Sequence, residues 1–242
     1  MAASHHPAIR FYFKSLYKPK KGSLSEFIDA FSKQNKTVTV VQIGANDGFN
    51  HDPIFKFIFR DNWNGVLLEP QPLVFHNFLK KLHAKNPLIE LVNAAIDYHD
   101  GQKILYRVSF SDERWAHGLS GFKKDTLLKA YESGFIQYMA SKTGTIVSDN
   151  DEWIKEEIVN CICPETLLEL YHIKKIDWLQ IDTEGFDFEV IKMFDLTGLK
   201  PSVISFEHTH LTSSDLNDCY TLLKAKGYKL LHFGGNTIAR KV

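Results

Sequence analysis

The chain has 242 residues, enough for one sizeable α/β domain but short for two full ones. Its 29 basic side chains (Lys and Arg) balance 29 acidic ones, so the formal net charge is zero and does not favour nucleic acid or an anionic membrane as the main partner. The hydrophobic content of 44% predicts a packed core, and no apolar run is long enough to span a membrane.

Three cysteines, Cys161, Cys163 and Cys219, are an odd and low number that is typical of a reducing compartment. Cys161 and Cys163 lack the two-residue spacer of a zinc or redox pair, which favours a structural role for these thiols. We therefore expect a soluble protein located in the cytoplasm.

Residues 1–36 are expected to form an amino-terminal arm and a helix that pack on the core. Ser23 and Glu26 have the spacing of a capping box, in which each side chain accepts from the other's backbone amide. A helix is predicted to follow to about Gln34, with apolar residues at helical spacing.

Apolar runs then alternate with helical segments. Strands are predicted at 37–43, 65–69 and 88–93, with helices at about 53–60 and 70–85 between them. Nearly continuous apolar runs indicate parallel strands buried on both faces, the first half of a doubly wound sheet.

This alternation lapses between residues 110 and 160. The segment is polar and carries aromatic side chains. It contains a helical stripe that is more typical of core than of a contact surface, made up of Leu127, Leu128, Tyr131, Phe135, Tyr138 and Met139. Its length also suits a lid or substrate-binding insertion. His117 and Ser120 could close over a pocket from it, although loop polarity explains them equally well.

Regular alternation returns after residue 160. A helix is predicted to begin at 163, followed by a strand at 176–181, a helix to 194, a strand at 201–206, a helix at 214–226 and an antiparallel hairpin at 228–241. Residues 37–242 are therefore expected to form one α/β domain.

Two glycines, an Asn and an Asp occupy the loop Gly44–Gly48 after the first strand. In an open α/β sheet ligands bind outside the carboxyl ends of the strands, and glycine lets the backbone approach them closely. A plain tight turn is the alternative. Glu69 ends the next strand, where an acid can accept both hydroxyls of a ribose.

The loop chemistry disfavours a dinucleotide. Such a ligand needs glycine where Asn46 stands, and the carboxylate of Asp47 would repel its pyrophosphate. An acidic loop is better suited to a nucleoside that carries positive charge and no phosphate. S-adenosylmethionine, with its ammonium and sulfonium groups, has these properties.

Two motifs carry a family resemblance. Residues 41–48, VQIGANDG, resemble the cofactor motif of the FkbM family of S-adenosylmethionine-dependent methyltransferases, and residues 177–187, DWLQIDTEGFD, are similar to its second signature. Glu69-Pro70 and residues 93–96 also resemble family positions. The resemblance implies a Rossmann-like methyltransferase fold: a doubly wound, mostly parallel sheet with an antiparallel final strand. It also implies O-methylation of a sugar or another small molecule.

The same resemblance implies the cofactor contacts. They are Gly44, Asn46, Asp47 and Gly48 at the methionine end, Glu69 with Pro70 at the ribose, Asn93 and Ala94 at the adenine, and Asp182 near the methyl group.

A poorly acidic hydroxyl needs a base for methyl transfer. Asp182 and His208 are the candidates, with Glu207 and His210 in support; His208 and His210 would share one face of the strand. A strand-end histidine is as often a hydrogen-bonded structural residue.

These side chains leave other functions open. Asp182, Glu207, His208 and His210 could also hold Mg²⁺ or Mn²⁺, although no diagnostic ligand spacing supports a metal. The alternatives to a methyltransferase acting on a small-molecule or saccharide acceptor are therefore a metal-dependent hydrolase and a non-catalytic nucleoside-binding module.

Overall fold

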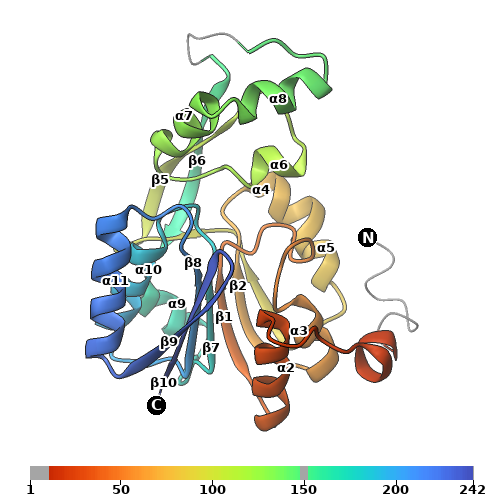
Figure 1. Cartoon of the computed structure of the whole chain (residues 1–242), viewed down its shortest axis with the longest axis vertical. Coiled ribbons are helices and arrows are strands. Elements are labelled where there is room, and N and C mark those ends of the chain that lie inside the picture. Colours follow the sequence, from red (N-terminus) through yellow and green to blue (C-terminus); the bar gives the residue numbers. More distant parts are fainter. Residues whose placement is uncertain (1–10, 148–151, 242) are drawn as a thin grey trace.

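A computed structural model describes residues 11–147 and 152–241. It contains a central seven-stranded sheet with the strand order β3-β2-β1-β7-β8-β10-β9 and a separate three-stranded sheet (Figure 1). The central strands are β1 (Thr39–Ile43), β2 (Asn64–Leu68), β3 (Ile89–Val92), β7 (Trp178–Ile181), β8 (Val203–Glu207), β9 (Tyr228–Phe233) and β10 (Asn236–Lys241).

Every strand pair of this sheet is parallel except the two that β10 makes, with β8 and with β9. The predicted doubly wound, mostly parallel sheet with an antiparallel final strand is thereby confirmed. Strand β1 pairs with β2 on one side and with β7 on the other, so the connections diverge at its carboxyl end. This point is where such sheets bind ligands.

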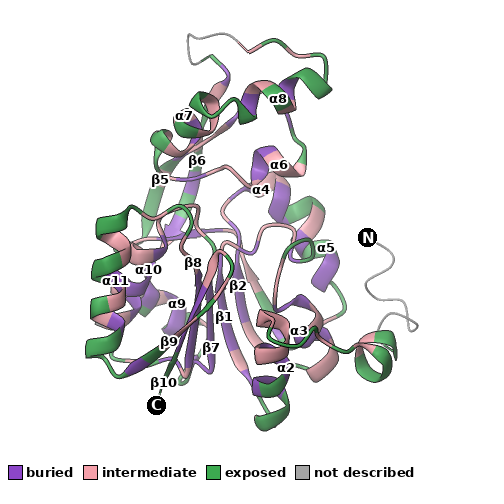
Figure 2. Ribbon diagram, viewed as in Figure 1, coloured by how far each residue is buried: buried purple, intermediate pink, exposed green. Residues whose placement is uncertain are grey.

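The inner strands are buried on both faces, as their apolar runs predict. Successive residues of β7 show this directly: Trp178 packs in one hydrophobic cluster with Trp63, and Leu179 packs in the other with Phe194. Figure 2 shows the resulting buried strands between partly exposed helices.

Helices cover both faces of the sheet. Around it lie η1 (Tyr12–Leu16), α2 (Leu24–Gln34), α3 (Phe55–Asp61), α4 (Pro72–Val74), η2 (Phe75–Leu79), α5 (Lys80–His83), α9 (Pro164–Leu170), α10 (Asp187–Leu196) and α11 (Ser213–Ala225). No described helix combines the length and apolarity needed to cross a bilayer.

Ser23 caps the amino-terminal end of α2, and its hydroxyl accepts from the backbone amide of Glu26 as predicted. The Glu26 carboxylate accepts from the backbone amide of Gly22, one residue earlier than a capping box requires. The helix is therefore capped at both expected residues, with the reciprocal bond displaced by one position. Residues 1–10 of the predicted arm lie outside the described part of the chain.

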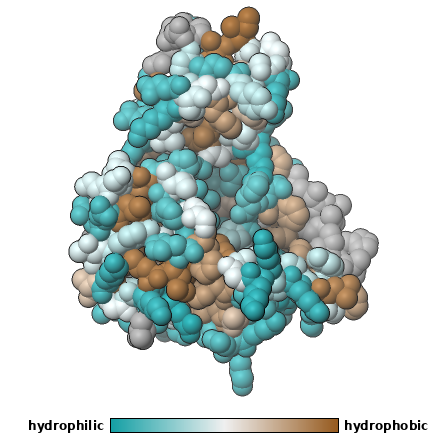
Figure 3. Space-filling model, in the orientation of Figure 1, coloured by the Kyte–Doolittle hydropathy of each residue, from teal (hydrophilic) through white to brown (hydrophobic). Residues whose placement is uncertain are grey.

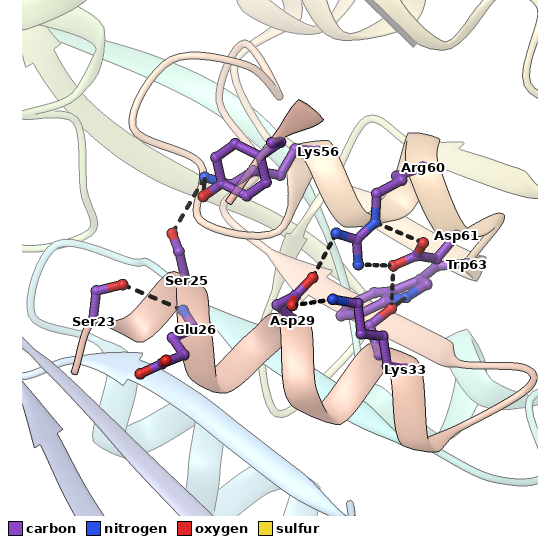
Figure 4. A network of polar contacts seen from close by, with 11 residues as sticks. Ser23, Ser25, Glu26, Asp29, Lys33, Lys56, Arg60, Asp61 and Trp63 are labelled. Atoms are coloured by element: carbon purple, nitrogen blue, oxygen red, sulfur yellow. Dashed lines mark hydrogen bonds and ion pairs between the residues drawn. The ribbon is translucent and has the colours of Figure 1, made fainter. Parts of the chain in front are cut away.

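A buried polar network fastens α2 to α3 (Figure 4). The guanidinium of Arg60 pairs with Asp29 of α2 at 2.5 Å and with Asp61 at 2.6 Å. The Asp61 carboxylate also accepts from the Ser32 hydroxyl, which in turn accepts from the indole N–H of Trp63. Each buried polar group here has a partner, so the contact fixes how α2 lies on the domain.

The insertion above the sheet contains β4 (Ala95–Ile96), β5 (Gly101–Val108), α6 (Arg114–His117), α7 (Lys124–Glu132), α8 (Phe135–Lys142) and β6 (Ile154–Ile162). The predicted stripe is only partly a core face: Leu127 is fully buried in a small core with Val108 and Trp153, whereas Phe135 and Tyr138 are exposed. Helix α8 instead buries Ile136 and Ala140, which lie outside that stripe. The long antiparallel β5–β6 ribbon was not predicted from the sequence.

Candidate functional site

A cavity of about 640 Å³, counting its open mouth, lies at the carboxyl ends of β1, β2 and β7. Its floor comes from strand ends, including Gly44, Glu69 and Asp182, and its roof from residues of the insertion between His117 and Phe122. The space-filling view shows the surface hollowed between the insertion and the main body (Figure 3).

The two loop glycines have different tasks. Both have a positive φ, +77° at Gly44 and +69° at Gly48. A Cβ on Gly44 would lie 1.8 Å from the carbonyl oxygen of Asp182, so glycine is needed for β1 and β7 to end side by side. A Cβ on Gly48 would instead meet Leu79 of η2 at 2.6 Å. Gly44 lines the cavity, and Gly48 serves the packing behind it.

Asn46 and Asp47, although adjacent in sequence, have different surroundings. The backbone amide of Asn46 donates to the Glu69 carboxylate at 2.8 Å, and Asn46 lines the cavity. The Asp47 carboxylate accepts from the amides of Phe49 and Asn50 and lies 3.5 Å from the guanidinium of Arg114. Asp47 therefore shapes its own loop and faces a neighbouring cavity.

Glu69 is buried at the end of β2. Besides the Asn46 amide, its carboxylate accepts from the backbone N–H and the side chain of Gln71. Burial raises the pKa of Glu69 to about 7, although these hydrogen bonds act in the opposite direction. Its four lone-pair positions are not all used by these three donors, so it can still accept from a ligand hydroxyl.

The other predicted adenine and ribose residues lie close by. Pro70 and Ala94 line the cavity. The side chain of Asn93 donates to the carbonyls of Glu69 and Pro70 at 2.8 and 3.1 Å, which makes it a positioning residue of this wall.

Gln71 connects the wall to the roof. Its side chain donates to the carbonyl of His117 and lies 3.0 Å from the His117 ring, while Ser120 donates to it at 3.1 Å. His117 and Ser120 thus close the cavity, and burial lowers the pKa of the His117 imidazole. Gln71 was missed from the sequence, which offers no signal for it beyond its place after Glu69-Pro70.

Carboxylates dominate the electrostatics. Asp182 is exposed to the cavity, and partial desolvation there together with the charges of Asp187 and Glu207 raises its pKa well above the usual range. Burial and the charge of Asp182 raise the pKa of Glu184 to about 9. Among the described residues that line the cavity there is no Lys or Arg to balance Glu69, Asp182 and Glu184. The site therefore favours a cationic ligand.

The strand-end histidines point in different directions. Strand β8 ends at Glu207, and the His208 amide turns to the carbonyl of Gly235. The His208 ring lies 3.0 Å from the hydroxyl of Thr237, away from the cavity, and burial lowers its pKa. His210 instead pairs with Glu184 at 3.2 Å. The two histidines do not share a face, because strand alternation stops before them.

Glu184, Glu207 and His210 bring three possible donor atoms within 4.8 Å of one another. Two members of the set predicted from the sequence, Asp182 and His208, are not in this group. Groups of acids and imidazole are common without an ion, and no further feature of the described residues marks a metal site.

The family model described as Methyltransferase FkbM domain matches residues 42–230, most of the chain. The chain belongs to the FkbM methyltransferase family. It is an S-adenosylmethionine-dependent methyltransferase with a Rossmann-like fold, as the two motifs predicted.

Solved structures resemble the FkbM chain only distantly. A METTL16 MTase domain is 12% identical with a TM-score of 0.46, covering 90% of this chain and 65% of its own. A precorrin-6y C5,15-methyltransferase from Geobacter metallireducens GS-15 is 13% identical with a TM-score of 0.44, and the match covers 94% of this chain and 92% of that protein. An O-methyltransferase from Bacillus cereus in complex with SAH is 11% identical with a TM-score of 0.41, and the match covers 97% of each chain. No curated protein matches the chain.

The residues of the cavity fit the cofactor of the FkbM family. S-adenosylmethionine brings an ammonium group, a ribose and a methyl group activated on a positive sulfur. The cavity offers carboxylates without a counter-charge, a buried acid with a spare acceptor position at Glu69, and a backbone segment without a side chain at Gly44.

Proposed function

We propose that this methyltransferase methylates a hydroxyl oxygen of a saccharide or another small molecule. The observation that carries the proposal is the carboxylate of Asp182, which faces the cavity among other acids and has a strongly raised pKa. In its ionised form, which a cationic cofactor favours, a carboxylate with a raised pKa is a better proton acceptor than an ordinary aspartate, which is what a poorly acidic hydroxyl requires.

In the proposed reaction Asp182 is the base. As the acceptor oxygen bonds to the methyl carbon, the carbon–sulfur bond breaks, its electron pair stays on sulfur, and the hydroxyl proton passes to Asp182. Glu69 and the backbone at Gly44 and Asn46 hold the cofactor, while Pro70 and Ala94 border its nucleoside end. The zero net charge supports a small acceptor rather than nucleic acid, and three free cysteines support work in the cytoplasm.

The test compares the two bases predicted from the sequence. Asp182→Asn should lower kcat for methyl transfer at least ~100-fold while cofactor affinity, measured by calorimetry, changes less than ~10-fold. His208→Gln should leave kcat within about a factor of three, because its ring faces Thr237. Equal losses in both variants, or a loss confined to His208→Gln, would contradict the assignment of the base.

Assays on the unmodified protein distinguish the two alternative functions from methyl transfer. Cofactor binding without transfer to any member of a broad hydroxyl panel would indicate a nucleoside-binding module. Esterase or phosphatase turnover that requires Mn²⁺ would instead indicate a hydrolase built on Glu184, Glu207 and His210.

A further inference from the structure

A second hollow lies between the insertion helices and the loop that follows β8. It encloses about 1000 Å³, counting its open mouth. One wall comes from α7, α8 and the connections that precede them, and the other from residues 209–212. The lining residues are Leu119, Thr126, Lys129, Ala130, Ser133, Phe135, Thr209, His210, Leu211 and Thr212. We refer to this hollow as the insertion groove.

The insertion groove meets the cofactor cavity at one pair of side chains. Glu184 lines the cavity and His210 lines the groove, and their carboxylate and imidazole lie 3.2 Å apart. Thr126 of α7 donates to the carbonyl of Glu184 at 3.4 Å, so the helix above is in contact with the same residue. A molecule lying in the groove therefore reaches the cavity wall at Glu184.

The hydroxyl groups of the groove are mostly hydrogen-bond acceptors. Ser133 donates its proton to the carbonyl of Ala130, Thr209 donates to Glu207, and Thr126 donates to Glu184. Because these protons are used within the protein, the three oxygens offer lone pairs to a ligand. A groove of this kind suits a molecule with many O–H donors.

The remaining lining supports the same class of ligand. Leu119, Phe135 and Leu211 provide apolar surface beside these oxygens, and Phe135 is 39% exposed. Saccharides present C–H faces between their hydroxyls, which pack on aromatic and aliphatic side chains. Lys129 is the one formally charged side chain among the lining residues, all of which the structure describes.

We infer that the insertion groove binds the methyl acceptor, a neutral polyhydroxylated molecule of the saccharide class, and delivers its hydroxyl past the Glu184–His210 pair. The inference rests on the proposed O-methylation. The neighbouring cavity beside Asp47 and Arg114 is the competing location. It lies across His117 and, unlike the groove, is lined by no residue of the segments that follow β7 and β8.

Two serines of the insertion allow a matched test. Ser133 lines the groove and Ser141 does not, yet both are exposed and each donates to the carbonyl three residues earlier. With a panel of methyl glycosides and labelled cofactor, Ser133→Trp should raise the acceptor KM at least tenfold. Ser141→Trp should stay within twofold. Both variants should keep the cofactor affinity and melting temperature of the parent protein.

A binding measurement complements turnover. In protein saturated with the demethylated cofactor, addition of the best glycoside should shift the amide resonances of Thr126, Ser133 and Thr212. Shifts confined to Asn50 and Arg114, or equal KM values for both tryptophan variants, would overturn the groove assignment. If the cofactor binds but no glycoside is methylated, the saccharide class is wrong. If the cofactor does not bind, the proposed function itself fails, independently of the groove.

Discussion

At the scale of single residues, the end of β1 shows how one side-chain atom decides the site. Gly44 and Gly198 have nearly the same φ, +77° and +74°. A Cβ at Gly44 would meet the carbonyl of Asp182, whereas a Cβ at Gly198 would have no heavy atom within 4 Å. Comparing alanine at these two positions therefore separates the free-energy cost of a positive φ from the cost of a steric clash with the Asp182 carbonyl.

Gly198→Ala should lower the free energy of unfolding by about 1 kcal/mol, the cost of a positive φ alone. Gly44→Ala should lower it by about 3 kcal/mol or more, because β1 and β7 must also move apart. Urea unfolding followed by circular dichroism measures both. Similar losses would show that the Asp182 carbonyl does not constrain Gly44.

Part of the site could be predicted from sequence at this scale. Gly44, Glu69 and Asp182 follow strands whose pairing continues to their ends, so the motifs place them at the cavity. The directions of Asp47 and His208 could not be predicted. Both directions depend on local hydrogen bonds that no sequence periodicity encodes. The Asp47 carboxylate accepts from backbone amides of its own loop, and the backbone amide of His208 donates to the carbonyl of Gly235 in the hairpin turn. The predicted acidic character of the pocket therefore comes from Asp182 and Glu184 instead of Asp47.

At the scale of elements, helices and inner strands were predicted within a few residues, but the β5–β6 ribbon was not. Most of the β6 residues are exposed or only partly buried, and its sequence KEEIVN has no sustained apolar face. Its stability comes from eight residue pairs with β5, a contact distant in sequence. Local patterns do not encode such pairing.

The α2–α3 network gives an element-scale prediction. The side chain of Arg60 is 6% exposed and pairs with Asp29 and Asp61, so Arg60→Met removes the cation that pairs with Asp61 and leaves Asp29 only the exposed Lys33. The free energy of unfolding should fall by about 3 kcal/mol. Lys33→Met is the control, since Lys33 also pairs with Asp29 but is 68% exposed, and it should cost less than about 1 kcal/mol. Equal effects of the two changes in chemical denaturation would contradict the account.

At the scale of the whole molecule, acids gather at the carboxyl edge of the sheet. Burial raises the pKa of Asp52 and Asp187 to about 6 and that of Glu69 to about 7. An acid whose pKa is higher in the folded protein stabilises it fully below the unfolded pKa, and this stabilisation is lost as pH rises through the folded value. The contribution of these acids to folding of the ligand-free protein should thus be largest below about pH 4 and fall as the pH rises to about 7.

The expected result is a decrease of at least about 2 kcal/mol in the free energy of unfolding between pH 5.5 and 8. Denaturant titrations at intermediate pH values measure it. A cationic ligand should reduce the decrease, because it favours the ionised carboxylates. Stability that rises over this pH range in the ligand-free protein would show that the acids are not destabilised by burial.

The most direct measurement of the acidic cofactor cavity is calorimetric binding of S-adenosylmethionine and its demethylated product at pH 6 and pH 8. The two molecules differ in the sulfonium charge, so ionisation of Glu69 and its neighbours should strengthen binding of the first more than that of the second. We expect the affinity ratio to shift about tenfold in favour of S-adenosylmethionine at the higher pH. An unchanged ratio, or no binding of either molecule, would contradict the account.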